Sequence, residues 1–132
     1  MPMAEVRFER EDETVVAVVT GEVDMSNATS VRQQIAESVT PNDDAVIIDL
    51  SELSFIDSAG LHSLIELGTV LDERRQKLLL CLPPGSTIRR AIEIIGLPHA
   101  VAVYSDRSEA MGAVRASAVK SRPIGPGPTE NG

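Results

Sequence analysis

The sequence predicts an α/β fold: a mixed sheet of four to five strands, opened by an N-terminal hairpin, with about four helices packed on it. First, strand-like apolar runs alternate with helix-periodic segments along the chain. Second, residues 45–50 and 78–82 are almost continuously apolar, which is typical of parallel strands covered on both faces. Third, only a short polar turn separates the first two strand-like runs, which indicates a hairpin.

The other expected strands follow from composition and alternation. Residues 6–10 alternate apolar and charged side chains, as an edge strand does, and residues 11–13 form the polar turn after it. Residues 14–20 are β-branched and apolar, so we expect a more buried strand paired with the first. A last, short strand is expected at residues 101–104.

The first two helices are predicted from 3.6-residue periodicity. The first ends near Val39, and Asp24, Ser26 and Asn27 all compete to be its N-cap. The second covers residues 61–71 after Ser58. The predicted inward stripes are Ala28, Val31, Ile35 and Val39 on the first helix and Leu61, Leu64, Ile65, Gly68 and Leu71 on the second.

The last two helices have clear end signals. The third starts at Ser86 or Thr87, and Gly96 ends it. Its expected inward residues are Ile88, Ala91, Ile92 and Ile95. The fourth runs to about residue 118 and opens with a capping box formed by Asp106 and Glu109.

Domain organisation follows from length and composition. The 132 residues are enough for one domain with a single core, which we place at residues 1–118. Residues 119–132 are rich in proline and glycine and show no periodicity, so we predict a disordered tail.

Charge and cysteine content exclude several function classes. The net charge of −8 argues against direct nucleic-acid binding, which depends on attraction to phosphates. Cys81 is the only cysteine, so an internal disulfide and a multi-cysteine zinc site are excluded, and its apolar strand predicts an inert core thiol. The first residues lack the apolar core of a signal peptide and no run is long enough to cross a membrane, so we expect a cytoplasmic protein without membrane insertion.

The stretch Phe55-Ile56-Asp57-Ser58-Ala59-Gly60-Leu61 lies between the apolar run 45–50 and the second helix. We expect Ser58 to be the N-cap of that helix, because its hydroxyl can accept a hydrogen bond from a first-turn N–H group. Gly60 lets the backbone approach closely and leaves the serine uncovered. Free N–H groups and the helix dipole would tolerate a phosphate on Ser58, although the serine is also explained by capping alone.

A second stretch, Gly21-Glu22-Val23-Asp24, also closes a strand and precedes a helix. The two motifs, in this order, resemble the STAS domain, and more narrowly the bacterial anti-sigma factor antagonists, from about residue 6 to about residue 118. In that family the partner is an anti-sigma factor that is also a serine kinase, and it phosphorylates the serine of the D-S-x-G-L motif. The resemblance implies an antagonist that binds this partner when Ser58 is unphosphorylated, releases the sigma factor and is inactivated by phosphorylation.

The resemblance also implies that this surface binds the partner, and we expect its residues to be Asp24, Asp57, Ser58, Ala59, Gly60, Leu61 and His62. Asp24 and Asp57 are also explained as turn or cap residues, and His62 as a solvated helix residue. The resemblance places Asp24 near Asp57 at one end of the sheet and lets Asp57 orient the hydroxyl of Ser58. Ala59 departs from the frequent D-S-S-G-L pattern and leaves Ser58 as the only hydroxyl inside the motif. A phosphatase acting on phospho-Ser58 is expected to reset the switch.

One alternative remains open: a constitutive STAS binding module, such as the cytosolic subunit of a lipid-transport ABC complex. We do not expect an enzyme, although Ser58, His62 or His99 and an aspartate could be combined on paper. The chain has neither a G-x-S-x-G nucleophile elbow nor a Walker loop, H-E-x-x-H or G-x-G-x-x-G motif, so we expect no catalytic residues, no metal and no cofactor.

Overall fold

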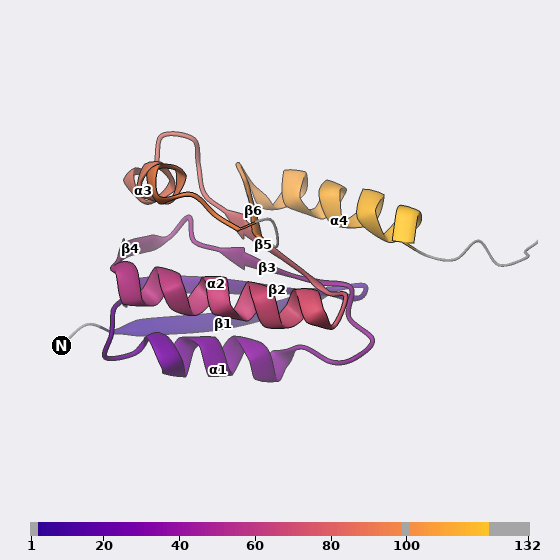
Figure 1. Ribbon diagram of the computed structural model, residues 1–132, viewed down its shortest axis with the longest axis horizontal. Helices are drawn as coiled ribbons and strands as arrows, with labels where there is room; N and C mark the ends of the chain where they lie inside the picture. Colours follow the sequence, from indigo (N-terminus) through magenta and orange to yellow (C-terminus); the bar gives the residue numbers. More distant parts are fainter. Residues whose placement is uncertain (1–2, 99–100, 122–132) are drawn as a thin grey trace, which may run out of the picture.

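The computed structural model describes residues 3–98 and 101–121. The first half of the chain folds into β1 (Ala4–Glu11), β2 (Thr14–Val23), α1 (Ala28–Ser38), β3 (Ala45–Asp49), β4 (Leu53–Ile56) and α2 (Ser58–Glu73). The second half adds β5 (Lys77–Cys81), α3 (Thr87–Ile95), β6 (Val101–Tyr104) and α4 (Arg107–Ser121). Figure 1 shows these elements in chain order.

The strands form one mixed sheet in the order β1-β2-β3-β5-β6, and β4 pairs with β2 beyond the end of β3. The hairpin partner β1 is antiparallel to β2, whereas β3, β4, β5 and β6 all lie parallel to their neighbours. The predicted fold class is therefore confirmed, including the N-terminal hairpin and four helices among the described residues. The described sheet has six strands, one more than the four to five predicted, and β4 is the strand that the sequence did not predict.

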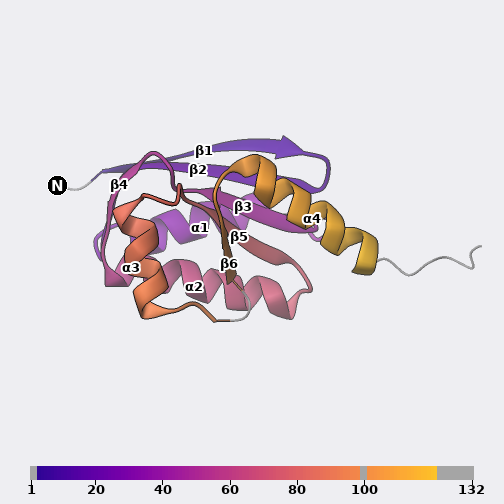
Figure 2. The same ribbon diagram turned by 90° about the horizontal axis from the view of Figure 1, so that it is seen from above.

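Alternate residues of the central strands point to opposite faces of the sheet and build two cores. One face, with Val46, Ile48 and Leu80, is covered by α1 and α2, and Ile92 of α3 also joins this core. The other face, with Ile47 and Leu79, packs against Ala110, Met111 and Val114 of α4. Figures 1 and 2 show α1 and α2 on one side of the sheet and α4 on the other.

Helix α3 differs from its prediction. Ile92 is buried and Ile88 is half-buried, but Ala91 and Ile95 are exposed rather than inward. The physical reason is that the apolar sector of this helix is wider than the part of it that the core covers. The predicted ends are confirmed, because Ser86 is the N-cap and Gly96, with a φ of 85°, is the C-cap.

The C-terminal helix continues to Ser121, so the first three residues of the predicted tail, 119–121, are helical. The rest of that predicted tail, 122–132, lies outside the described residues. Across the described ranges, no helix combines the length and the apolar character needed to cross a membrane.

Candidate functional site

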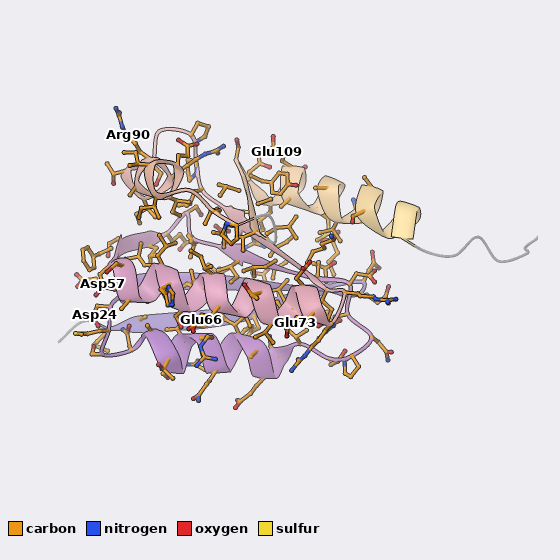
Figure 3. All side chains as sticks on the ribbon, in the orientation of Figure 1. Asp24, Asp57, Glu66, Glu73, Arg90 and Glu109 are labelled. Carbon is orange, nitrogen blue, oxygen red and sulfur yellow. The ribbon has the colours of Figure 1, made fainter. Side chains whose placement is uncertain are left out.

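The two sequence motifs lie side by side because β2 and β4 are parallel neighbours. Val23 at the end of β2 is in register with Ile56 at the end of β4, and the N–H of Asp57 donates to the carbonyl of Val23 over 3.1 Å. The carboxyl ends of both strands therefore meet at one edge of the sheet. Figure 3 shows Asp24 and Asp57 next to each other there.

Asp57, not Ser58, is the N-cap of α2, which corrects the sequence prediction. Asp57 has extended backbone angles, and its Oδ1 accepts a hydrogen bond of 2.8 Å from the N–H of Gly60. Its Oδ2 accepts a second one of 3.2 Å from the N–H of Met25. A carboxylate caps as well as a hydroxyl does and has two acceptor oxygens. Asp57 thus holds the start of α2 and the turn after β2 together.

Ser58 is left free by this arrangement. It is the first residue of α2, it is exposed, and among the described residues its hydroxyl has no hydrogen-bond partner. The nearby serines differ. The hydroxyl of Ser54 donates to the carbonyl of Gly21 over 2.8 Å, and buried Ser63 donates to the carbonyl of Ala28 over 3.3 Å. Ser54 and Ser58 are both exposed, but of these three hydroxyls only that of Ser58 has no hydrogen-bond partner among the described residues.

Gly60 allows α2 to lie directly against the strands. A Cβ atom at this position would come within 2.8 Å of side-chain carbons of both Val23 and Ile56, closer than carbon atoms can pack. The expected close approach of the backbone at Gly60 is therefore confirmed. It fixes how far the first turn of α2, and with it Ser58, stands from the sheet.

Asp24 orders the turn that follows β2. Its Oδ1 accepts from the N–H of Ser26 over 2.8 Å and from the Ser26 hydroxyl over 2.6 Å. These hydrogen bonds, led by the one from the hydroxyl, hold the pKa of Asp24 below its usual value. Asn27, one of the three predicted candidates, is the N-cap residue of α1, although its side chain accepts from the N–H of Asp24 instead of from the helix.

The remaining predicted residues have different surroundings. Ala59 is half-buried, and Leu61 is buried in the main core. His62 is exposed, with its Nε2 at 3.9 Å from the carboxylate of Glu66 one turn later on α2. Met25 was not among the predicted residues, although its N–H joins the two motifs. The one signal for it in the sequence is its place directly after the G-E-V-D stretch.

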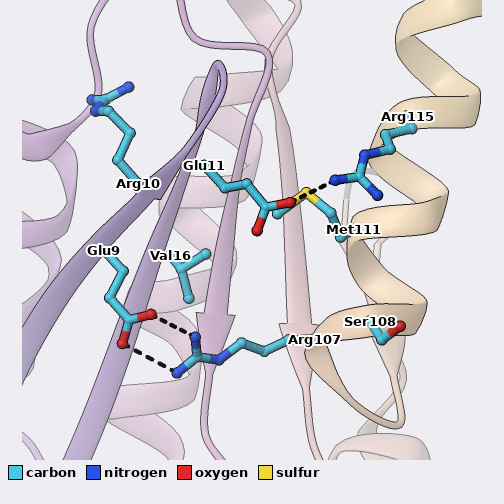
Figure 4. A pocket seen from close by; sticks show the side chains of 8 residues that line it. All are labelled: Glu9, Arg10, Glu11, Val16, Arg107, Ser108, Met111 and Arg115. Carbon is cyan, nitrogen blue, oxygen red and sulfur yellow. Dashed lines mark hydrogen bonds and ion pairs between the residues drawn. The ribbon is translucent and has the colours of Figure 1, made fainter.

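A second candidate site lies between β1 and α4, on the opposite face of the sheet. It is a pocket of about 310 Å³, and the side chains around it are drawn in Figure 4. The guanidinium of Arg107 donates to Glu9 over 2.7 and 3.3 Å and to Asp49 over 3.1 Å. Arg115 pairs with Glu11. Both of these cations are therefore already neutralised by carboxylates, so the pocket offers an anion little attraction.

The charged residues at this second site, Asp49, Arg107 and Glu9, stabilise the fold. Burial acts to raise the pKa of Asp49, but hydrogen bonds from the hydroxyl and N–H of Ser51 and from Arg107 outweigh it and leave the pKa lowered. Hydrogen bonds to Glu9 and Asp49 in turn raise the pKa of Arg107. The ion pairs of Arg107 with Asp49 and Glu9 tie the start of α4 to β3 and β1. Burial raises the pKa of the Cys81 thiol to about 12, as expected for an unreactive core residue.

Within residues 3–98 and 101–121, no group of three or more His, Cys, Asp or Glu side chains is arranged to hold a metal ion. The candidate reactive group of the site is the hydroxyl of Ser58, which is exposed at the first position of α2. Its neighbours Asp24 and Asp57 are both engaged as hydrogen-bond acceptors in turns.

Comparison with known proteins gives a consistent result. The family model described as the STAS domain matches residues 5–110. The anti-sigma-F factor antagonist RsfB of Mycobacterium tuberculosis is 31% identical over 106 residues, which cover 79% of this chain and 85% of that protein.

Two solved structures extend the comparison. The crystal structure of an anti-sigma factor antagonist from Mycobacterium paratuberculosis is 30% identical, with a TM-score of 0.74, and the match covers 86% of this chain and 95% of that one. The Bacillus cell fate determinant SpoIIAA, solved in its phosphorylated form, is 25% identical, with a TM-score of 0.62, and the match covers 84% of this chain and all of that one.

Proposed function

The chain belongs to the STAS domain family, with anti-sigma factor antagonists among its relatives, and from this premise we propose that it is itself an anti-sigma factor antagonist controlled by phosphorylation of Ser58. In this proposal the unphosphorylated protein binds an anti-sigma factor that is also a serine kinase, and the sigma factor is released. The observation that carries the proposal is the free, exposed hydroxyl of Ser58 at the first position of α2.

The local geometry supports phosphorylation without unfolding. Asp57 performs the capping, so a phosphate on Ser58 does not displace the acceptor that the first turn of α2 needs. The N–H groups at the start of the helix and its dipole favour the added negative charge. The carboxylates of Asp24 and Asp57 nearby oppose it. The fold is expected to persist while the surface changes its charge.

The partner responds to that change of charge. Phosphorylation adds about −1.5 to −2 charges at neutral pH. At about 5 Å and an effective dielectric near 20, one unit of like charge on the partner costs roughly 3 kcal/mol. This corresponds to a loss of affinity on the order of a hundredfold. The kinase supplies the nucleotide and the catalytic groups, so the antagonist needs no catalytic residue of its own, and a phosphatase restores the binding form.

The first experiment is affinity capture from a lysate of the protein's own organism, combined with phosphopeptide mass spectrometry. Wild type and Ser58→Ala are expected to retain an anti-sigma factor with serine kinase activity, and Ser58→Asp is expected to lose it. Ser108→Asp is the matched control, because it adds the same charge to an exposed serine in the first turn of α4, on the other face of the sheet.

The mass spectra add a second criterion. Phosphate is expected on Ser58, with an occupancy that changes between growth and stress, and not on Ser54 or Ser63. Equal capture by wild type and Ser58→Asp would contradict the electrostatic switch. Recovery of an ABC ATPase in place of a kinase would indicate a constitutive STAS binding module.

A further inference from the structure

The large apolar side chains that remain exposed are concentrated at the end of the molecule that carries Ser58. Of the seven in the described part of the chain, five belong to segments at this end of the ribbon (Figure 1): Met3 precedes β1, Met25 follows β2, Phe55 lies in β4, and Ile94 and Ile95 lie in α3. The other two are Phe8, farther along β1, and Val70, near the C-terminal end of α2. Hydrogen bonds hold the main chain at Met3 and Met25: the Met3 carbonyl accepts from the N–H of Glu22, and the Met25 N–H donates to the side-chain carboxylate of Asp57. A cluster of this kind on a small protein marks a binding surface.

Helix α3 contributes two adjacent isoleucines to this cluster. Ile94 and Ile95 are 78% and 62% exposed, and with exposed Ala91 they form one stripe at helical spacing. An ordinary solvated helix face carries polar residues there. Nothing in the described chain covers the stripe.

The orientation of α3 shows which way this stripe is turned. On the opposite flank, Arg89 donates to the carbonyl of Leu82, just after β5, over 2.9 Å and to the hydroxyl of Ser105, just after β6, over 3.3 Å. Ile92 points into the core, and Arg90 points away from the sheet. The stripe is therefore turned away from β5 and β6. On that side lie β4 and the first turn of α2, in both views of the molecule (Figures 1 and 2).

The border of this apolar surface is acidic on the side of Ser58, whereas exposed Arg90 lies beside Ile94 on α3. Glu22 and Glu52 are exposed at the same end, and Asp24 and Asp57 are half-buried there. A second copy of the chain is a poor occupant, because a symmetric contact would bring the two sets of carboxylates toward each other. A partner with apolar side chains at the centre of its contact and Lys or Arg at the rim fits both features.

We propose that the α3 stripe, formed by Ala91, Ile94 and Ile95, is a second contact for the anti-sigma factor kinase, continuous with Met25 and Phe55 around Ser58. The inference rests on the proposed function and extends it. Phosphorylation changes the charge at Ser58 but not at the stripe. The stripe therefore contributes affinity in both states of the switch and determines which kinase is recognised, whereas Ser58 determines when the complex forms.

Photo-crosslinking in the protein's own organism tests this placement directly. p-Benzoylphenylalanine replaces Ile94 in one strain, Met25 in a second and exposed Glu37 of α1 in a third. The proposal expects the same serine kinase to be linked through positions 94 and 25 and not through position 37. Linkage at 25 but not at 94 overturns the second contact and leaves the proposed function intact.

The other outcomes are also decisive. A kinase linked at neither position means that the proposed function fails, and the second contact fails with it. A second copy of the chain linked at position 94 overturns the proposal in favour of a dimer.

Binding measurements with the purified kinase then test the division of roles. Ile94→Ala/Ile95→Ala is expected to weaken binding on the order of tenfold. It is expected to do so by the same factor in a wild-type and in a Ser58→Asp background, because the two contacts act independently. Val70→Ala is the matched control, since Val70 is an exposed apolar residue on α2 outside the cluster, and it is expected to change binding less than twofold. An unchanged affinity of the double variant, with its circular dichroism spectrum intact, overturns the proposal.

Discussion

Helices α2 and α3 each begin beside a serine, but only one of the two serines caps its helix. At the start of α3, Ser86 is the N-cap, and its hydroxyl accepts a hydrogen bond of 3.2 Å from the N–H of Arg89. At the start of α2 the cap is Asp57, and Ser58 follows it as the first helical residue. A shift of one position changes the hydroxyl from a structural acceptor into a free group on the surface.

The comparison also shows what an aspartate adds at such a position. Ser86 has a single side-chain oxygen, and it serves its own helix. Asp57 has two, so it caps α2 through Gly60 and also binds the N–H of Met25 in the turn after β2. The start of α2 is consequently fixed to the turn after β2, so the backbone at Ser58 is held in place. Such preorganisation lowers the cost of binding and supports the proposal that a kinase recognises Ser58.

The glycines beside the two serines provide the sharpest test of this difference. Gly60→Ala is expected to destabilise the protein by about 1–3 kcal/mol, because the added methyl group meets the stiff β-branched side chains of Val23 and Ile56. Gly85→Ala, next to Ser86, is the control, since an added methyl group there would have no other atom within 4 Å. Urea unfolding measures both. Equal stabilities of the two variants would show that the α2 start is not tightly packed.

Removing the cap of α2 is expected to have the next largest effect. Asp57→Ala should cost about 1–2 kcal/mol, because the N–H groups of Gly60 and Met25 both lose their acceptor. Asp57→Asn keeps an acceptor oxygen for the cap and is expected to lose less. Urea unfolding gives the stabilities, and amide chemical shifts report the two sites. A Met25 amide that does not respond to Asp57→Ala would mean that the two loops are not joined through this side chain.

Replacing the two serines by alanine is expected to change stability less, and by different amounts at the two positions. Ser86→Ala should destabilise the protein by about 1 kcal/mol, as the loss of a capping hydroxyl does. Ser58→Ala should stay within about 0.5 kcal/mol of wild type, because no hydrogen bond is lost and alanine is a better helix former than serine. Thermal unfolding of both variants checks this. If Ser58→Ala lowered the free energy of unfolding as much as Ser86→Ala does, Ser58 would have to be a capping residue after all.

The sequence predicted the fold class because hydrophobic periodicity reports burial directly. The continuous apolar runs at 45–50 and 78–82 are central strands, and the alternating run at 6–10 lies in the edge strand. Strand β4 escaped prediction because it has only four residues, two of which, Ser54 and Phe55, are exposed. Its pairing with β2 is a tertiary contact that no local pattern records.

The site could be located from the sequence but not described in detail. Asp57 and Ser58 are adjacent and are similarly good N-caps, so sequence alone cannot decide which one takes the position. The structure decides it because Asp57 pairs with the end of β2 through its backbone. The exposed stripe of α3 was missed for a related reason. Periodicity gives the width of an apolar helix face and not how much of it the neighbouring elements cover.

The smallest expected effect is a pH dependence of stability, and it comes from Asp24 in the turn after β2 that Asp57 holds. Hydrogen bonds from Ser26 lower the pKa of Asp24 below its usual value of 3.8, so the charged carboxylate stabilises the folded turn. This contribution is complete above the unfolded pKa and is lost as the pH falls through the lower, folded pKa. Ser26→Ala should raise the pKa of Asp24 toward its usual value, as a carboxyl NMR titration would show. In the wild type the Met25 amide should follow this titration, while the Arg89 amide at the start of α3 should not. If both amides responded alike, the coupling between the two loops would not be specific to the start of α2.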